Sequence, residues 1–140
     1  MPAVERIEGW EGRLARVIEA ARHERYALGE HDCFRLACQA VHALTGVDHW
    51  AAWAGRYHTP REALRLLSEN GGSFTGAFTQ LFGVDPCMPH WSRRGDVLEY
   101  RDATGQQHLG VCVGARVAVL GEQGLMFMWL DDCAHCWRIG

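Results

Sequence analysis

The residues best suited to chemistry form the tripeptide His31-Asp32-Cys33, which opens an apolar-periodic run. Asp32 is a favourable helix N-cap because its carboxylate accepts hydrogen bonds from backbone N–H groups one turn further on. Cys33 therefore takes the first helical position, where the positive end of the helix dipole favours thiolate over thiol. Since a thiolate attacks carbonyl carbons, Cys33 is a candidate nucleophile. The alternative is a buried structural cysteine near a helix start.

A cysteine nucleophile usually works with a histidine that moves the proton. Among the eight histidines, His108 differs because it lies at the start of a predicted strand over residues 107–114. Glycines at positions 110 and 114 leave room for close backbone approach. His108 can face the helix start that carries Cys33 and form a Cys–His pair with it. The alternative is an ordinary strand residue beside a turn.

The elements that must position these residues follow from the apolar period, which changes near Gly83. Helices are predicted over residues 9–25, 32–44, 60–69 and 73–82. The third begins with the capping box Thr59-Pro60-Arg61-Glu62, and its apolar residues, Leu64 included, are expected to face inward. Strands are predicted over residues 97–100, 107–114, 116–120, 125–130 and 137–139. Short turns between strands imply an antiparallel meander, so we expect an α+β domain with N-terminal helices packed on a C-terminal antiparallel sheet.

Bulk composition excludes several classes of protein. A length of 140 residues indicates one domain, and a net charge of −3 argues against a nucleic-acid partner. No apolar run approaches the ~18 residues that would span a membrane. The N-terminus has no hydrophobic signal core, so we expect synthesis in the cytoplasm without a signal peptide. Six cysteines without such a signal are expected to be reduced thiols, a metal site or a catalytic residue, not a disulfide framework.

Three motifs, in order, resemble those of the NlpC/P60 cysteine peptidases, which are compact papain-like cell-wall hydrolases. Tyr26-Ala27-Leu28-Gly29 before Asp32-Cys33 resembles the family's Tyr-x-x-Gly lead-in to its Asp-Cys motif. Arg94-Gly95-Asp96-Val97-Leu98 resembles its Pro-Gly-Asp-Leu strand, and the strand that begins at His108 resembles its His-Val-Gly-Ile-Tyr-Ile-Gly. The chain looks closest to the small members encoded in tail modules of phages and gene transfer agents. The resemblance covers residues 26–120 of a single domain, 1–140, with an N-terminal helix in 1–25 and C-terminal strands in 121–140.

The resemblance implies a papain-like fold and a set of roles. Cys33 would be the nucleophile, His108 the general base, and Tyr26 a group near the oxyanion, together with backbone N–H groups at the helix start. The implied substrate is a peptidoglycan stem peptide, cleaved through a thioester without a cofactor. The implied setting is the tip of a virion tail, where wall hydrolysis would open the way for DNA entry and hub proteins would be partners.

Two departures from the family pattern leave an alternative open. Phe34-Arg35 stands where the family commonly has Ser-Gly, which changes the cleft wall. Residues 116–120 are apolar where the family has a third polar residue that orients the imidazole, although Glu122 and Gln123 are near. The alternative is a catalytically inert tail-tip component with an occluded groove and an exposed apolar patch. It would dock through a tryptophan-rich surface formed by Trp50, Trp53, Trp91, Trp129 and Trp137.

The run Cys133-Ala134-His135-Cys136 offers a third hypothesis. Cysteine pairs with this spacing ligate zinc when further ligands join them, and Cys87 is the nearest candidate. The alternative is a pair of buried or loop thiols, and we expect no metal.

Overall fold

The computed structural model describes residues 4–140. Residues 1–3, the start of the N-terminal segment that was expected to lack a signal peptide, lie outside the described residues. Helices precede strands, as predicted for an α+β domain. The helices are α1 (Trp10–Ala21), α2 (Cys33–Thr45), α3 (Pro60–Glu69) and α4 (Phe74–Phe82). The strands are β1 (Val97–Arg101), β2 (Gln107–Cys112), β3 (Arg116–Gly121), β4 (Gly124–Trp129) and β5 (Cys133–Trp137). Three short 3-10 helices lie between them: η1 (Trp50–Ala52), η2 (Pro89–Trp91) and η3 (Leu130–Asp132).

Helix α2 is built as the sequence predicts. Asp32 has an extended backbone and its Oδ1 accepts a hydrogen bond from the backbone N–H of Arg35 at 2.9 Å, which makes it the N-cap. Cys33 is therefore the first helical residue. The helix ends at Gly46, whose left-handed φ of 79° closes the last turn. Its buried face includes Leu36, Ala40 and Leu44, and it packs on β2.

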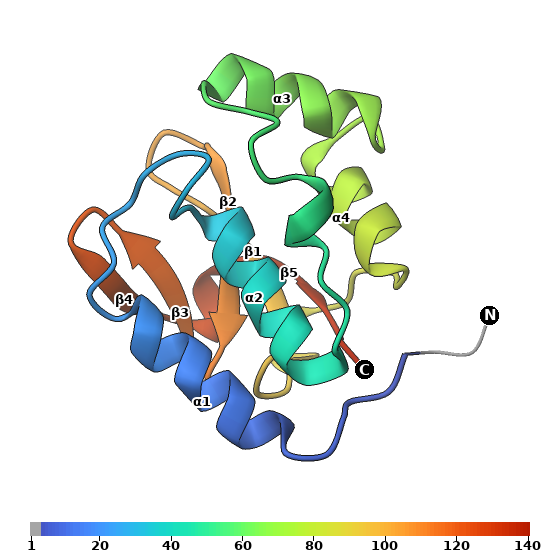
Figure 1. Ribbon diagram of the computed structural model, residues 1–140, viewed down its shortest axis with the longest axis vertical. Coiled ribbons are helices and arrows are strands. Elements are labelled where there is room, and N and C mark those ends of the chain that lie inside the picture. Colours follow the sequence, from blue (N-terminus) through green and yellow to red (C-terminus); the bar gives the residue numbers. More distant parts are fainter. Residues whose placement is uncertain (1–3) are drawn as a thin grey trace.

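Helix α3 begins at its predicted cap, and the first residue of the predicted fourth helix, Ser73, is the N-cap of α4. Thr59 Oγ1 accepts from the backbone N–H of Glu62 at 3.2 Å, and Ser73 Oγ accepts from that of Gly76 at 3.0 Å. The inward orientation expected for Leu64 is wrong, because its side chain is 67% exposed. Helix α3 packs mainly on α4 and stands away from the sheet, so one side of it has no protein neighbour (Figure 1).

Helix α1 ends four residues before the predicted end at residue 25. The carbonyl of Arg22 accepts from the N–H of Leu125 in β4 at 3.2 Å, so the chain leaves the helix to contact the sheet. Such a long-range hydrogen bond is invisible in local helix propensity, which explains the error.

The sheet has the order β4-β3-β2-β1-β5, with every neighbouring pair antiparallel. Strands β1 to β4 form the predicted meander. The last strand lies earlier than the predicted 137–139, because the chain crosses through η3 to the far edge. There β5 pairs with β1, which places Cys136 opposite Leu98 and Trp137 opposite Val97.

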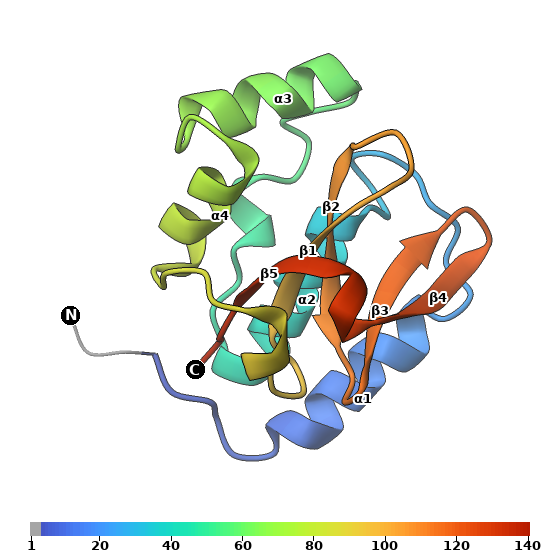
Figure 2. The same ribbon diagram turned by 180° about the vertical axis from the view of Figure 1, so that it is seen from behind.

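Both faces of the sheet are covered. Figure 1 shows α1 and α2 on one face, over a core that includes Leu44, Val111 and Trp137. Figure 2 shows η2 and η3 in front of the other face, where Cys112 and Cys136 join a second apolar cluster. Trp137 is fully buried, so its predicted place on a docking surface is wrong. Within residues 4–140 no helix has the length and apolarity to cross a membrane.

Asp96, from the motif before β1, joins distant parts of the chain. Its fully buried carboxylate accepts from Arg6 Nη2 at 2.9 Å and from the backbone N–H of Ile139 at 2.8 Å through Oδ1. Oδ2 accepts from the backbone N–H of Arg93 at 2.7 Å. One side chain thus fastens the N-terminal segment, the loop before β1 and the C-terminal segment.

Candidate active site

The three residues expected to carry the chemistry line one cleft. Cys33, His108 and Tyr26 border a cavity of about 610 Å³ between the start of α2, the β1–β2 hairpin and the pair α3 and α4. This volume is in the range of ordinary small-molecule sites. Residues from three separate parts of the sequence therefore meet in a space that can hold a substrate.

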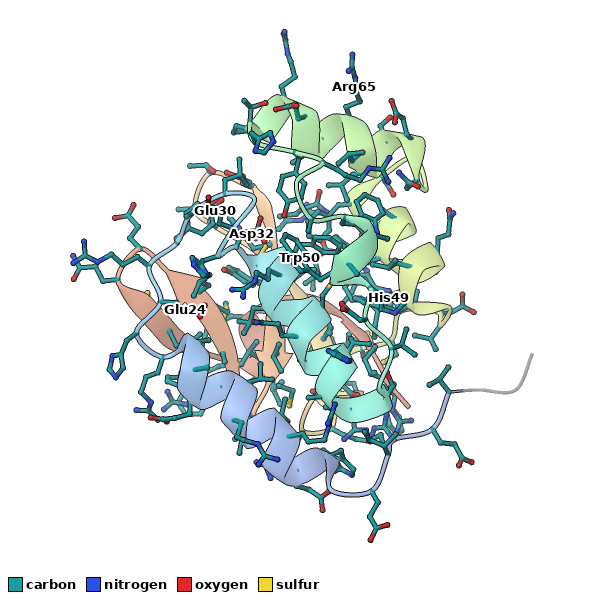
Figure 3. The ribbon with its side chains drawn as sticks, in the orientation of Figure 1. Glu24, Glu30, Asp32, His49, Trp50 and Arg65 are labelled. Carbon is teal, nitrogen blue, oxygen red and sulfur yellow. The ribbon has the colours of Figure 1, made fainter. Side chains whose placement is uncertain are left out.

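The lead-in to Cys33 is held by Asp32, which Figure 3 shows at the start of α2. Asp32 Oδ2 accepts from the backbone N–H of Gly29 at 2.9 Å and from the hydroxyl of Tyr57. Gly29 has φ +82°, and a Cβ there would lie 2.6 Å from the carbonyl oxygen of Tyr57, so only glycine fits. Tyr57 was not foreseen, because it lies in an irregular stretch with no local pattern. Together these contacts make a rigid mount for Cys33.

The Cys33 thiol is not activated in the expected way. The pKa of the thiol is raised to about 12, mainly by burial and also by the charge of Asp32. The backbone N–H groups of Leu109, Cys33 and Phe34 lower the pKa, but by less. The expected shift towards thiolate is therefore wrong, since desolvation of a charged sulfur outweighs the donors at the helix start. At neutral pH the thiol is protonated and needs a base.

Leu109, whose N–H acts on the Cys33 thiol, lies just before the stretch of β2 that pairs with β3. The register between β2 and β3 covers only Val111 with Ala118 and Cys112 with Val117. Gly110 borders this junction, and a Cβ there would lie 2.6 Å from Val117 Cγ1, so the predicted close approach at Gly110 is confirmed. Gly114 has open space and a φ of +125°, so its role is a turn.

His108 is oriented by Asp102, six residues earlier on the β1–β2 hairpin. Nε2 of His108 lies 2.9 Å from Oδ2 of Asp102, and its ring stacks on Tyr100 with centroids 5.1 Å apart. Hydrogen bonds from Thr104 and then His108 hold the pKa of Asp102 below its usual value, so Asp102 is ionised. An ionised carboxylate accepts a hydrogen bond from Nε2–H, which places the lone pair of the imidazole on Nδ1.

Asp102 is the orienting residue that the sequence did not reveal. The family pattern places such a residue in 116–120, whereas in this structure it comes from the turn between β1 and β2. Its only sequence signal was the turn Asp102-Ala103-Thr104-Gly105 directly before the strand of His108.

The Cys–His pair is not closed in the structure. Among residues 4–140, no hydrogen bond joins Cys33 to His108, and Nδ1 of His108 has no partner in the described part of the chain. Catalytic hydrogen bonds are often long in free enzymes and tighten only with substrate. Nδ1 is therefore the nitrogen available to receive a proton from the thiol or from a group bound beside it.

Tyr26 lies at the cleft with 41% of its surface exposed. Burial first, and then the charges of Cys33 and Asp32, raise the pKa of Tyr26. Its hydroxyl therefore keeps its proton and can donate a hydrogen bond to a developing oxyanion. This is the kind of group that its expected role requires.

Of the two residues that depart from the family pattern, only Phe34 reaches the cleft. Its ring contacts Trp50 and Trp53 edge to face, with centroids 5.7 and 5.5 Å apart. Arg35 turns away, and its Nη1 lies 2.7 Å from His31 Nδ1 and 3.5 Å from Glu24. Phe34 therefore forms part of the cleft wall, whereas Arg35 does not.

The cysteines of the C-terminal motif lie on β5. Cys133 and Cys136 pack in the second apolar cluster, and His135 Nδ1 lies 3.4 Å from Oε1 of buried Glu99. Within the described residues 4–140, no group of three or more His, Cys, Asp or Glu side chains could hold a metal ion. These thiols are explained as strand residues in an apolar layer.

We expect the substitution Asp102→Asn to reduce any hydrolysis that uses His108 as its base by about 10²- to 10⁴-fold. An asparagine can donate to Nε2, which moves the ring proton to Nδ1 and removes the base. The measurement is kcat/KM on an amide substrate, with exposed Asp131→Asn as the matched control. Wild-type activity in Asp102→Asn would contradict the orienting role.

Comparison with known proteins gives one family and no curated relative. A family model described as Domain of unknown function (DUF6950) matches residues 5–139. No curated protein matches the chain. The matched segment contains every residue of the cleft.

Proposed function

The chain belongs to the DUF6950 family, and we propose that it is a cysteine hydrolase that cleaves an amide bond with Cys33 as nucleophile. The observation that carries the proposal is the cleft shared by Cys33 and a histidine whose tautomer is set by Asp102. A thiol, a base with a free Nδ1 and nearby donors are the three parts that acyl transfer requires.

The chemistry proceeds in two steps. The sulfur of Cys33 attacks the carbonyl carbon while His108 takes the thiol proton, and the oxyanion is held by N–H groups at the start of α2 and by Tyr26. The C–N bond breaks, His108 passes the proton to the leaving amine, and a thioester remains on Cys33. Water then attacks the thioester, which releases a carboxylic acid and restores the thiol.

The substrate and setting that we propose come from the resemblance to NlpC/P60 peptidases. The bond would lie in a peptidoglycan stem peptide, and the protein would act at the tip of a phage-type tail during DNA entry, beside hub proteins. The motif order and the site support this proposal. The direct test is digestion of purified peptidoglycan by wild type and by Cys33→Ala, with mass spectrometry of the released peptides. Absence of cleavage by wild type would reject this substrate.

A second candidate is an inert structural component of the tail tip. It is favoured by the raised pKa of the Cys33 thiol and by exposed apolar side chains on the edge strand β4, such as Trp129, which is 54% exposed. The cleft lined by Cys33 argues against this candidate, because an inert component was expected to have an occluded groove. Partner binding that survives Cys33→Ala, together with no turnover of any amide, would favour this candidate.

The pKa of Cys33 makes the alkylation rate a sharp test. Because the thiol pKa is about 12, only a very small fraction is thiolate at neutral pH. We expect the rate with iodoacetamide to rise about tenfold per pH unit from pH 7 to 10, with no plateau near the ~8.5 of a free thiol. The rate is read by mass spectrometry of the peptide that carries Cys33, and a plateau below pH 8 would show an ion pair instead.

A further inference from the structure

The cleft wall across from Cys33 is apolar. Helices α3 and α4 contribute Leu64, Leu67, Phe74 and Leu81 to it, and Leu64 is largely exposed although it is a leucine. The charged residues of α3 are absent from the lining of the cleft. Figure 3 shows one of them, Arg65, directed away from the rest of the molecule. An apolar surface held open to water gains stability when an apolar group covers it.

Aromatic side chains continue this wall towards the nucleophile. Phe34, the residue directly after Cys33, packs against Trp53 and Phe78, and all three line the cleft. The apolar surface is therefore continuous with the reacting sulfur. A group bound on it would be attached to the carbonyl carbon that Cys33 attacks.

The same wall offers few hydrogen-bond partners. Most of its backbone N–H and C=O groups are paired within α3 and α4, apart from those in the first turn of each helix and in the connection between them. Of the residues within α3 and α4 that line the cleft, Ser68 alone has a polar side chain, and in the connection between the helices Ser73 Oγ already accepts from the N–H of Gly76. A peptide laid there would bury amide groups without partners, which is costly. A hydrocarbon chain has no such requirement.

The opposite side of the cleft is polar. Tyr26, Gln106 and His108 line it beside the solvent. The two sides together fit a molecule whose acyl part is apolar and whose amine part is polar.

From this division we propose that the substrate is an amide whose acyl part is an aliphatic chain, bound against α3 and α4. The inference rests on the proposed nucleophile Cys33 and replaces the stem-peptide acyl group, which was proposed from the family resemblance alone: the acyl group that Cys33 carries as a thioester is aliphatic, not a peptide residue. The C–N bond breaks, the polar amine leaves with a proton from His108, and water releases the aliphatic acid.

Two length-matched amides of aminomethylcoumarin test the proposal. One carries an octanoyl group and the other a suberoyl group, which has the same chain with a terminal carboxylate. We expect kcat/KM for the octanoyl amide to exceed that for the suberoyl amide by about tenfold or more, because an apolar pocket rejects a buried charge. Equal or reversed rates would overturn the inference while leaving amide hydrolysis at Cys33 intact.

The substitution Leu64→Glu tests whether the aliphatic acyl chain of the substrate binds against α3. We expect it to remove most of the preference for octanoyl, whereas Met126→Glu, an equally exposed site on β4 outside the cleft, should leave it unchanged. Both side chains are exposed, so neither change threatens the fold. A preference that survives Leu64→Glu would contradict the assigned wall.

A binding measurement separates this inference from the proposed function. Calorimetry of Cys33→Ala with octanoate and with suberate needs no turnover. Octanoate binding that Leu64→Glu abolishes, without hydrolysis by wild type, would reject the nucleophile and keep the apolar site. Neither binding nor hydrolysis would reject both.

Discussion

Replacing Cys33 with alanine is expected to abolish amide hydrolysis, with a loss of at least about 10⁴-fold in kcat. Cys33 is the first residue of α2 and lines the cleft with His108, so its sulfur is the only proposed atom that can form the thioester. Without the sulfur the thioester cannot form, so the proposed reaction has no first step. The measurement is the initial rate on an octanoyl amide, with trapping of the acyl-enzyme by mass spectrometry.

Cys38→Ala is the matched control for this loss. Cys38 lies one turn and a half along α2 and is fully buried in the core away from the cleft. Its replacement removes a thiol of the same helix at a cost of about 1 kcal/mol in unfolding free energy, but leaves the nucleophile in place. Activity should therefore persist in Cys38→Ala below its melting temperature. Activity that persists in Cys33→Ala would show that the chemistry lies elsewhere.

Asp96→Ala is expected to be the most destabilising single change, with a loss of about 3–5 kcal/mol in unfolding free energy. The carboxylate is fully buried, and its removal leaves the guanidinium of Arg6 and the N–H groups of Arg93 and Ile139 without their acceptor. Deleting a buried charge leaves its partners buried without a hydrogen-bond acceptor. This costs far more unfolding free energy than a surface ion pair contributes. The measurement is urea unfolding followed by circular dichroism.

Exposed Asp85→Ala provides the reference for this measurement and should change stability by less than about 0.5 kcal/mol. Asp96 lies away from the cleft, so the folded fraction of Asp96→Ala should retain the alkylation profile of Cys33. The two largest effects are thus separable: Cys33→Ala loses chemistry and keeps the fold, and Asp96→Ala loses stability and keeps the chemistry. A loss below about 1 kcal/mol in Asp96→Ala would contradict the buried network.

Local signals predicted the elements that position the site. Helix starts at Asp32 and Thr59 were readable because a capping side chain bonds a backbone N–H only three residues away. The alternation of apolar and polar residues and the short turns predicted the antiparallel meander, because these signals also lie within a few residues of one another. The spacing of residues near Cys33 and His108 was sufficient to name both as candidates.

Long-range packing decided the features that local patterns cannot contain. The fifth strand pairs with β1 at the far edge, and Trp137 is core instead of surface, because the chain crosses the sheet through η3. Asp102 became the partner of His108 only when the hairpin folded back.

By itself, then, the sequence determined the helix caps, the strand order of the meander and the placement of Cys33 at the head of α2, since each depends on neighbours within a few residues. Only the tertiary structure decided the protonation of the thiol and the character of the cleft. Desolvation of Cys33 depends on every element packed around it, and it outweighs the helix dipole that the sequence suggested. Leu64 likewise became a cleft residue only because α3 stands away from the sheet, which no periodicity within α3 records.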